Sequence, residues 1–256
     1  MVYNYYVILY SKGSTMQPTI DIHCHVMPGV DDGSPDMASS LEMLKIAEKE
    51  GITHMILTPH HKPMHHNVSP EHNVAYRKKL KEAALAEGIK VKLFSGNEIY
   101  YSDETMDELI GGQICSLAGS DYVLVEFHPT ATYKSIQNAA YKVQGAGYIP
   151  IIAHIERYSD IVSHPARVSD LINLGCYIQV NASSIMGDYG FGIGHFCKKI
   201  LKDELVHFVA SDAHDAKKRA PKLSDCRKYV ERKFGSDYAD RLFFLNAANV
   251  IRNEQI

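Results

Sequence analysis

Short apolar runs alternate along the chain with longer segments in which apolar residues recur every three or four positions. The runs have the length of buried strands, and the periodic segments have the spacing of amphipathic helices. We expect seven strands, over Thr19–His25, Thr53–Thr58, Lys90–Glu98, Asp121–Glu126, Tyr148–His154, Cys176–Asn181 and Leu205–Asp212. We expect helices over Pro35–Glu50, Ser69–Glu87, Asp103–Gly111, Tyr133–Gly145, Pro165–Leu174 and Ile193–Asp203, and a helical segment over Pro221–Val250. This alternation predicts parallel strands joined by crossover helices.

The length and the strand count favour an α/β barrel of about seven strands over an open doubly wound sheet. The chain has 256 residues, of which 45% are hydrophobic, which excludes disordered and fibrous classes. No linker, repeat or low-complexity run interrupts the alternation, so we expect one domain over residues 19–256.

The first eighteen residues, Met1–Pro18, precede the first strand and are interpreted as an N-terminal extension that is poorly ordered or not native. Its apolar piece Tyr5–Tyr10 is too short to span a bilayer, and no basic region precedes it. We therefore expect neither a signal peptide nor a membrane anchor. Whether Met1 or Met16 is the true start stays open.

Charge and cysteine content narrow the class of partner. The formal net charge is -3 and no basic block is present, so nothing predicts binding to nucleic acid or to an anionic membrane surface. A small molecule or a peptide is the expected substrate. The five cysteines are odd in number and never spaced Cys-x-x-Cys, which indicates reduced thiols in the cytoplasm.

Metal-binding residue types recur where the predicted strands end. His23 and His25 point to the same side if their segment is extended, because side chains alternate across a strand. An isolated His-x-His pair also occurs by chance, but six of the seven predicted strands end in a histidine or carboxylate of the kind that binds metals. Nine candidate ligands result: His23, His25, Asp32, His60, Glu98, Glu126, His154, Asp212 and His214. In parallel barrels the chemistry gathers at this edge of the sheet.

Nine ligands exceed what one ion needs, so we expect about two or three divalent ions. Imidazole ligands suit zinc, iron or manganese better than calcium or magnesium. Two ions about 3.5–4 Å apart polarise phosphoryl oxygens and lower the pKa of a bound water that then attacks phosphorus. The same arrangement also serves amide hydrolysis, so the ligands alone leave the reaction class open.

Two arginines bear on that choice. Arg157 follows His154 by three residues, and Arg219 follows His214 by five. Guanidinium groups match phosphate oxygens bidentately, and we expect both arginines on loops at the ligand-bearing rim. The alternative for each is a solvated surface residue or a structural ion pair.

A family resemblance rests on several motifs. They are Asp21–His25, Pro28–Gly33, Thr58–His61, Gly96–Tyr101, Val125–Phe127, Ala153–Tyr158 and Ser211–His214. Together they resemble the polymerase-and-histidinol-phosphatase (PHP) superfamily, and within it the bacterial tyrosine-protein phosphatases of capsular and exopolysaccharide synthesis. The resemblance runs from Thr19 to the C-terminus. The N-terminal extension and the Phe127–Pro129 segment depart from the family pattern.

This resemblance implies a distorted TIM-like barrel with a trinuclear centre, usually of manganese. It implies that His23, His25, Glu98 and Asp212 hold one ion, that Glu98 bridges to a second ion held by Glu126 and His154, and that Asp32, His60 and His214 hold a third. Arg157 and Arg219 would bind phosphate. The implied substrate is phosphotyrosine on the tail of a bacterial tyrosine autokinase.

Three other functions remain as alternatives. They are a PHP phosphatase of a small metabolite such as histidinol phosphate, a non-catalytic metal-binding scaffold, and an amidohydrolase.

Other reactive residues receive structural interpretations. Cys226 and Arg232 have the Cys-x5-Arg spacing of thiol-based tyrosine phosphatases, but no glycine-rich phosphate loop surrounds them and the stretch has a mid-helix pattern. Cys24 is expected in the core, and His128 on the surface. We expect His61, His65, His66 and His72 to lie on a solvated loop. We expect Tyr100 and Tyr101 to lie at the rim or to stack on the substrate ring.

Overall fold

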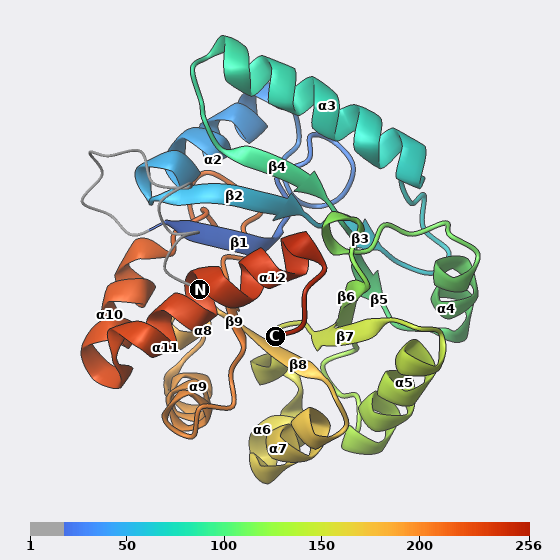
Figure 1. Ribbon diagram of the computed structural model, residues 1–256, viewed down its shortest axis with the longest axis vertical. Coiled ribbons are helices and arrows are strands. Elements are labelled where there is room, and N and C mark those ends of the chain that lie inside the picture. The colour runs from blue at the N-terminus through green and yellow to red at the C-terminus, as the bar shows by residue number, and fades with distance from the viewer. Residues whose placement is uncertain (1–17) are drawn as a thin grey trace.

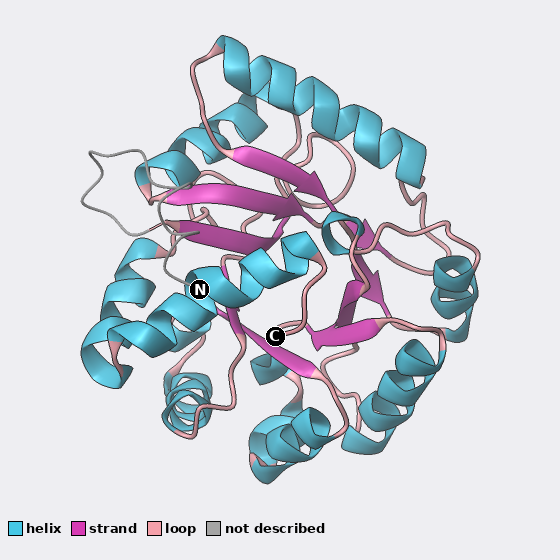
Figure 2. Ribbon diagram, viewed as in Figure 1, coloured by secondary structure: helices cyan, strands magenta, loops and turns pink. Residues whose placement is uncertain are grey.

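The computed structural model describes residues 18–256. Our expectations for Met1–Pro18 therefore lie outside the described residues, apart from Pro18 itself. Strands form a curled inner layer and helices surround it (Figures 1 and 2). Within the described range, no helix is both long enough and apolar enough to cross a membrane.

Parallel strands make up two sheets. The first has the order β1-β2-β4 and the second the order β3-β5-β6-β7-β8-β9. Their bounds are β1 Thr19–Cys24, β2 Ile52–Leu57, β3 His60–His61, β4 Lys92–Ser95, β5 Glu98–Tyr100, β6 Tyr122–Glu126, β7 Ile149–Ile152, β8 Tyr177–Asn181 and β9 Phe208–Ala210. A bridge between Cys24 and Ala213 brings the end of β1 to the chain that follows β9. The predicted α/β, TIM-like architecture is confirmed.

One predicted strand was wrong. The Lys90–Glu98 run divides into β4 and β5 at Gly96 and Asn97. A Cβ on Gly96 would lie 2.9 Å from Leu117 Cδ2, so the backbone itself packs there. The Asn97 side chain donates to the Pro59 carbonyl at 2.9 Å and accepts from the Cys115 amide at 3.0 Å. These contacts change the direction of the chain between β4 and β5. Glu98 of β5 then pairs with His60 of β3. The strand β3 is too short to be predicted from the sequence.

The helices follow the predicted pattern with shifts at their ends. The long ones are α2 Met37–Lys49, α3 Pro70–Ala86, α4 Asp103–Ile110, α5 Tyr133–Gly145, α7 Ala166–Asn173 and α9 Phe191–Lys202. Two one-turn helices were not predicted, α6 Ser159–Ser163 and α8 Ala182–Met186. The expected C-terminal helical segment is divided into α10 Ser224–Phe234, α11 Ser236–Asp240, a π-helical turn Arg241–Leu245 and α12 Asn246–Arg252.

The C-terminal segment closes one end of the barrel. Tyr122, which begins β6, donates to the Glu254 carbonyl at 2.9 Å, and Tyr177, which begins β8, donates to the Ile256 carbonyl at 3.2 Å. Figure 1 shows α12 lying across the ring of strands. Because this segment covers the amino ends of the strands, the carboxyl ends are left for the functional site.

Candidate metal centre

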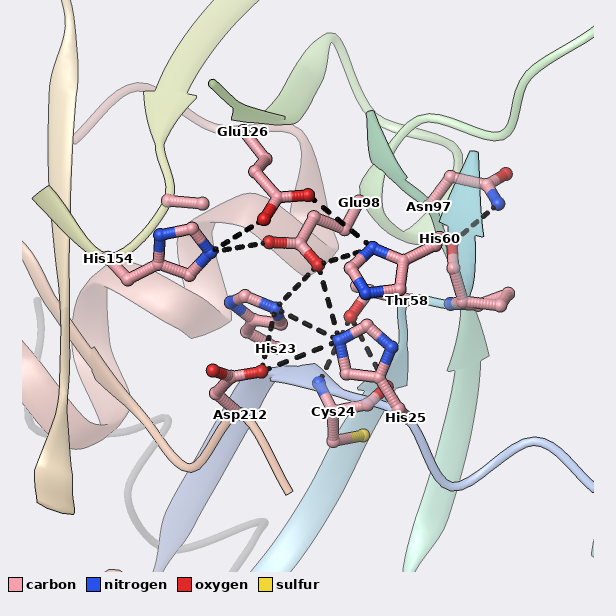
Figure 3. A network of polar contacts seen from close by, with 12 residues as sticks. His23, Cys24, His25, Thr58, His60, Asn97, Glu98, Glu126, His154 and Asp212 are labelled. Carbon is pink, nitrogen blue, oxygen red and sulfur yellow. Dashed lines mark hydrogen bonds and ion pairs between the residues drawn. The ribbon is translucent and has the colours of Figure 1, made fainter. Parts of the chain in front are cut away.

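The structure brings all nine candidate ligands together at the carboxyl ends of the strands. Ligand atoms within each group lie within 4.8 Å of one another, and the groups are His25/Asp32/His60/His214, His23/His25/Asp212, His23/Glu98/His154 and His60/Glu98/Glu126. Three of the groups share Glu98 or His23, and Figure 3 shows the side chains of the inner part of this cluster pointing toward one another. The overlap makes the cluster one continuous centre.

Glu98 lies in the middle of the centre and is almost fully buried. Its Oε2 atom is 3.3 Å from Nε2 of His23, 3.3 Å from Nε2 of His25 and 3.0 Å from Nδ1 of His60. Its Oε1 atom is 2.8 Å from Nε2 of His154. Burial acts to raise the pKa of this carboxyl, but His23 and the hydrogen bond from His154 outweigh burial and hold it well below its usual range. Glu98 is therefore an anion that faces four imidazoles.

The arrangement of electron-pair donors fits divalent cations. The Nε2 atoms of His23 and His25 face each other at 3.2 Å, and Oδ1 of Asp212 lies 3.5 Å from both. Nδ1 of His60 and the Oε2 atoms of Glu98 and Glu126 are buried without a hydrogen-bond partner among the described residues. Buried polar atoms normally have a partner, and nitrogen and oxygen donors gathered in this way are the ligands of zinc, iron and manganese.

Electrostatics within the centre shift several pKa values. Burial and the neighbouring Glu98 carboxylate raise the pKa of Glu126 to about 7. Burial disfavours the His25 imidazolium, yet the neighbouring carboxylates of Asp31 and Glu98 raise its pKa to about 10. Burial and repulsion from His25 lower the pKa of His214 to about 3. Carboxylates and imidazoles thus compete for protons within the centre. A bound cation would neutralise the negative charge of the carboxylates.

Asp31 orients the candidate ligand His25, a role that the sequence did not reveal. Its Oδ2 atom accepts from Nδ1 of His25 at 2.8 Å and from the His60 amide at 3.0 Å, and its Oδ1 atom accepts from the Gly33 amide at 3.0 Å. The Asp31 side chain is 5% exposed, whereas that of Asp32 is 65% exposed. Donation from Nδ1 directs the lone pair of Nε2 toward the centre.

Two amides in β8 form a second supporting layer. Gln179 Oε1 accepts from the His154 amide at 2.8 Å and contacts Nδ1 of His23 at 3.2 Å. Asn181 Nδ2 donates to Oδ2 of Asp212 at 2.8 Å. The sequence contained one sign of this role, because Gln179 and Asn181 occupy alternate positions in an otherwise apolar strand. Polar side chains buried in such a strand need hydrogen-bond partners.

The backbone turns sharply at two of the ligands. His154 has φ 30° and Asp212 has φ 51°, values in the left-handed region that non-glycine residues adopt at an energetic cost. Each residue lies two positions after the end of a strand, His154 after β7 and Asp212 after β9. The Asp212 amide donates to the His23 carbonyl at 2.9 Å, which holds the turn in place. The turn directs both side chains into the centre and away from the sheet edge.

The turn after β1 packs against the first pair of ligands. A Cβ on Gly33 would lie 2.2 Å from the His25 carbonyl oxygen, so only glycine fits at this position. The Ser34 amide donates to that same oxygen at 2.9 Å. This close approach brings Asp31 and Asp32 back over the histidines of β1.

Both arginines lie beside the centre and contact Asp212. The Nη2 atom of Arg157 lies 2.5 Å from Oδ2 of Asp212, and the Nη2 atom of Arg219 lies 3.0 Å from the same oxygen. Their side chains are 31% and 36% exposed, so part of each guanidinium faces solvent at the rim. Arg219 lies on a loop as expected, but Arg157 ends a single 3₁₀ turn, Ile155–Arg157. Both arginines thus form the structural ion pairs that were the alternative to phosphate binding. These ion pairs hold the two guanidinium groups at one edge of the site.

Two residues outside the centre, Cys226 and His61, lie in different surroundings from those expected. Cys226 lies in the first turn of α10, not in its middle, but burial raises the pKa of its thiol and no phosphate loop surrounds it. His61 is not part of a solvated loop, since it is buried in β3 and its Nε2 contacts Oε2 of Glu108 at 2.7 Å. Cys24 is buried, and His128 is exposed and hydrogen-bonded to Thr130, as expected.

Comparison with known proteins shows the family of the chain. Residues 19–252 match the family described as "Capsular polysaccharide synthesis, CpsB/CapC". The tyrosine-protein phosphatase YwqE of Bacillus subtilis is 34% identical over 237 residues, which cover 93% of each chain. The tyrosine-protein phosphatase CpsB of Streptococcus agalactiae serotype III is 32% identical over 242 residues, which cover 93% of this chain and all of that protein.

Solved structures extend the comparison. One from work on YwqE of Bacillus subtilis and CpsB of Streptococcus pneumoniae, described as unique metal-dependent tyrosine phosphatases, matches with TM-score 0.87 and 34% identity. The match covers 93% of this chain and 96% of that one. An organophosphorus hydrolase matches with TM-score 0.60 at 11% identity, which shows a shared barrel fold alone. The chain therefore belongs to the CpsB/CapC family of capsular polysaccharide synthesis.

Proposed function

We propose that this protein is a metal-dependent protein-tyrosine phosphatase that acts in capsular or exopolysaccharide synthesis. The observation that carries the proposal is the convergence of nine nitrogen and oxygen ligands with two guanidinium groups at the same rim. Relatives named as tyrosine-protein phosphatases match over 93% of the chain. A phosphate ester is the substrate that uses both the cation sites and the arginines.

For the metal centre, the overlapping groups support about two or three divalent ions. His23, His25, Glu98 and Asp212 would hold one ion. Glu98 would bridge to a second, held by Glu126 and His154, and the remaining group of Asp32, His60 and His214 would hold a third. Manganese is the proposed metal, with iron and zinc as alternatives. When bound, such ions polarise the phosphoryl oxygens and lower the pKa of water.

The residues of the chain have separate roles in the reaction. Arg157 and Arg219 would orient the phosphoryl oxygens, because each retains guanidinium N–H groups beyond the one that contacts Asp212. Asp31 would keep Nε2 of His25 free to coordinate by accepting the Nδ1 proton. Gln179 and Asn181 would keep His23 and Asp212 in position.

The proposed substrate is phosphotyrosine on the tail of a bacterial tyrosine autokinase in the cytoplasm. The family and the five free cysteines support this placement. The formal net charge of -3 gives no reason to propose a nucleic acid or an anionic membrane surface as a further partner.

Metal analysis combined with steady-state kinetics tests the proposal. Purified protein would be stripped with chelator, reloaded with manganese, iron or zinc, and assayed with a phosphotyrosyl peptide and with histidinol phosphate. We expect two or more ions per active chain and a higher kcat/KM for the peptide. Turnover of the metabolite alone would assign a metabolite phosphatase. Binding of ions without hydrolysis of either ester would indicate a scaffold, and amide hydrolysis alone an amidohydrolase.

A further inference from the structure

A hollow adjoins the candidate metal centre on the side of β9. It has a volume of about 410 Å³ and is lined by Met186, Tyr189, Asp212, Lys218, Arg219 and Lys222, among others. We propose that this pocket binds the peptide segment flanking the phosphotyrosine and selects an acidic side chain there. The inference rests on the proposed phosphatase function, since it names the substrate sequence that the same site prefers.

The pocket is continuous with the proposed phosphate-binding rim. Asp212 and Arg219 line it and also belong to the centre. Tyr189 lines its wall, and the ring of Tyr189 lies 6.0 Å from the guanidinium carbon of Arg157. A phosphoryl group held by the two arginines would therefore leave the adjoining residues of its peptide at the entrance of this pocket.

Its lining reaches both ends of the strands. Asp212 lies two residues after β9, at the carboxyl end, whereas Glu50 caps the end of α2 and lies two residues before β2, at the amino end. An extended peptide advances about 3.3 Å per residue, so a hollow lined by residues from both ends suits an extended chain.

An apolar and an aromatic side chain on its wall are exposed to solvent. Met186 is 46% exposed and Tyr189 is 48% exposed. Both lie at the short connection between α8 and α9, where Gly187 and Gly190 adopt positive φ. Large side chains presented in this way at the edge of a catalytic rim favour contact with a polypeptide.

The unpaired charge in the pocket is mainly positive. Lys218 and Lys222 are exposed, and neither forms an ion pair with a residue in the described part of the chain. Asp215 accepts from the Lys218 amide at 2.7 Å, which fixes the backbone of this loop.

The carboxylates that line the pocket are mostly engaged elsewhere. Glu50 accepts from the Ser224 amide at 3.0 Å, and Asp225 pairs with Lys228 at 3.1 Å. Of the lining carboxylates, Asp188 alone has no side-chain hydrogen bond or ion pair with a described residue. Two unpaired lysines against one carboxylate would attract an acidic residue of the substrate.

Peptide selectivity tests the inference. Manganese-loaded protein would be assayed with two phosphotyrosyl peptides that differ only in having glutamate or alanine beside the phosphotyrosine. We expect kcat/KM for the acidic peptide to exceed that for the neutral one about fivefold at low salt, the effect of two partly exposed ion pairs. The ratio should fall toward one as ionic strength rises.

The double variant Lys218→Ala/Lys222→Ala should bring this ratio close to one. Lys202→Ala/Lys233→Ala removes the same charge from exposed positions that do not line the pocket, and it should keep the wild-type ratio. A ratio is independent of the fraction of active protein, so partial misfolding cannot imitate the result. A wild-type ratio of one, or an unchanged ratio in the pocket variant, would overturn the inference. Failure of the wild-type protein to hydrolyse either peptide or p-nitrophenyl phosphate would instead refute the proposed function.

Discussion

Asp31 shows how much of the centre depends on a residue that is not itself among the candidate ligands. It accepts from the ring nitrogen of His25 that faces away from Glu98, and from the backbone of His60 and Gly33. It therefore joins the turn after β1 to two ligands. Partners of this kind fix the tautomer and ring orientation of a ligand.

Replacing Asp31 tests this orienting role. Asp31→Asn should lower metal affinity or kcat/KM by about 10- to 100-fold, because the amide is a weaker acceptor for His25 Nδ1 and offers a competing donor. Calorimetric metal titration and phosphopeptide kinetics measure the two quantities. Asp36→Asn is the matched control, since Asp36 is exposed and caps α2, a position where asparagine serves equally well. Equal behaviour of the two variants would contradict the assigned role.

The position of the turn after β1 depends on a backbone contact that any side chain at Gly33 would block. The turn from Gly29 to Ser34 packs onto His25 so closely that a Cβ on Gly33 has no space. This turn, more than β1 itself, sets where Asp31 and Asp32 lie relative to the histidines.

Gly33→Ala should displace that turn and reduce metal binding at least tenfold while the barrel remains folded. The reason is that the added methyl must move either the turn or the His25 carbonyl, and both hold the centre. Bound metal per chain and circular dichroism measure the two effects. Gly145→Ala, at the end of α5 with open space around its Cβ, should keep metal and gain up to about 1 kcal/mol of stability. Full metal occupancy in Gly33→Ala would refute this account.

The junction between β8 and the segment leading to β9 contains a buried histidine. Nδ1 of His207 accepts from the Ile178 amide at 3.1 Å, and its own amide donates to the Ile178 carbonyl at 2.9 Å. Burial lowers the pKa of His207 to about 4. A protonated ring could not accept from the amide, so this junction requires the neutral form.

This histidine should make stability depend on pH. Its folded-state pKa lies below the ordinary value of about 6.5, so the unfolded chain binds the proton first, and the stabilisation present above pH 6.5 is lost as the pH falls toward 4. Urea unfolding of metal-free protein measures the effect. The difference in unfolding free energy between the wild type and His207→Asn should be constant above pH 7 and shrink below pH 6.5. His128→Asn, at an exposed position, should show no such trend, and parallel curves for wild type and His207→Asn would disprove the role.

Across the whole molecule, one end of the barrel is closed by the C-terminal segment and the other holds a cluster of buried charge. Glu98, His23, His25 and Asp212 come from three strands or strand ends and are each almost fully buried. Their mutual contacts link β1, β5 and the end of β9, so whatever neutralises them also stabilises the closed arrangement of strands.

Chelation should therefore destabilise the entire fold. A ligand at about 1,000 times its dissociation constant adds about 4 kcal/mol, which for a domain of this size corresponds to a Tm shift of about 10 °C. Differential scanning calorimetry with and without chelator measures it. In Glu98→Gln, which lacks the bridging charge, the shift should be less than half as large. A wild-type Tm that chelator leaves unchanged would contradict a structural contribution from bound ions.

The sequence alone determined the alternation of strands and helices and the clustering of the nine candidate ligands. Both follow from local patterns, because apolar periodicity defines each element and parallel strands bring their carboxyl ends to one edge. His154 could thus be grouped with His23 although 131 residues separate them, as the difference of their numbers shows.

Only the tertiary structure decided what surrounds those ligands. The division of Lys90–Glu98 depends on the contact of Gly96 with Leu117, and the pairing of Arg157 with Asp212 joins residues 55 apart. Neither has a local signature, because each arises from the packing of segments that the sequence separates. The pocket beside β9 has the same origin, and so does the role of Asp31, which required the turn to fold back onto His25.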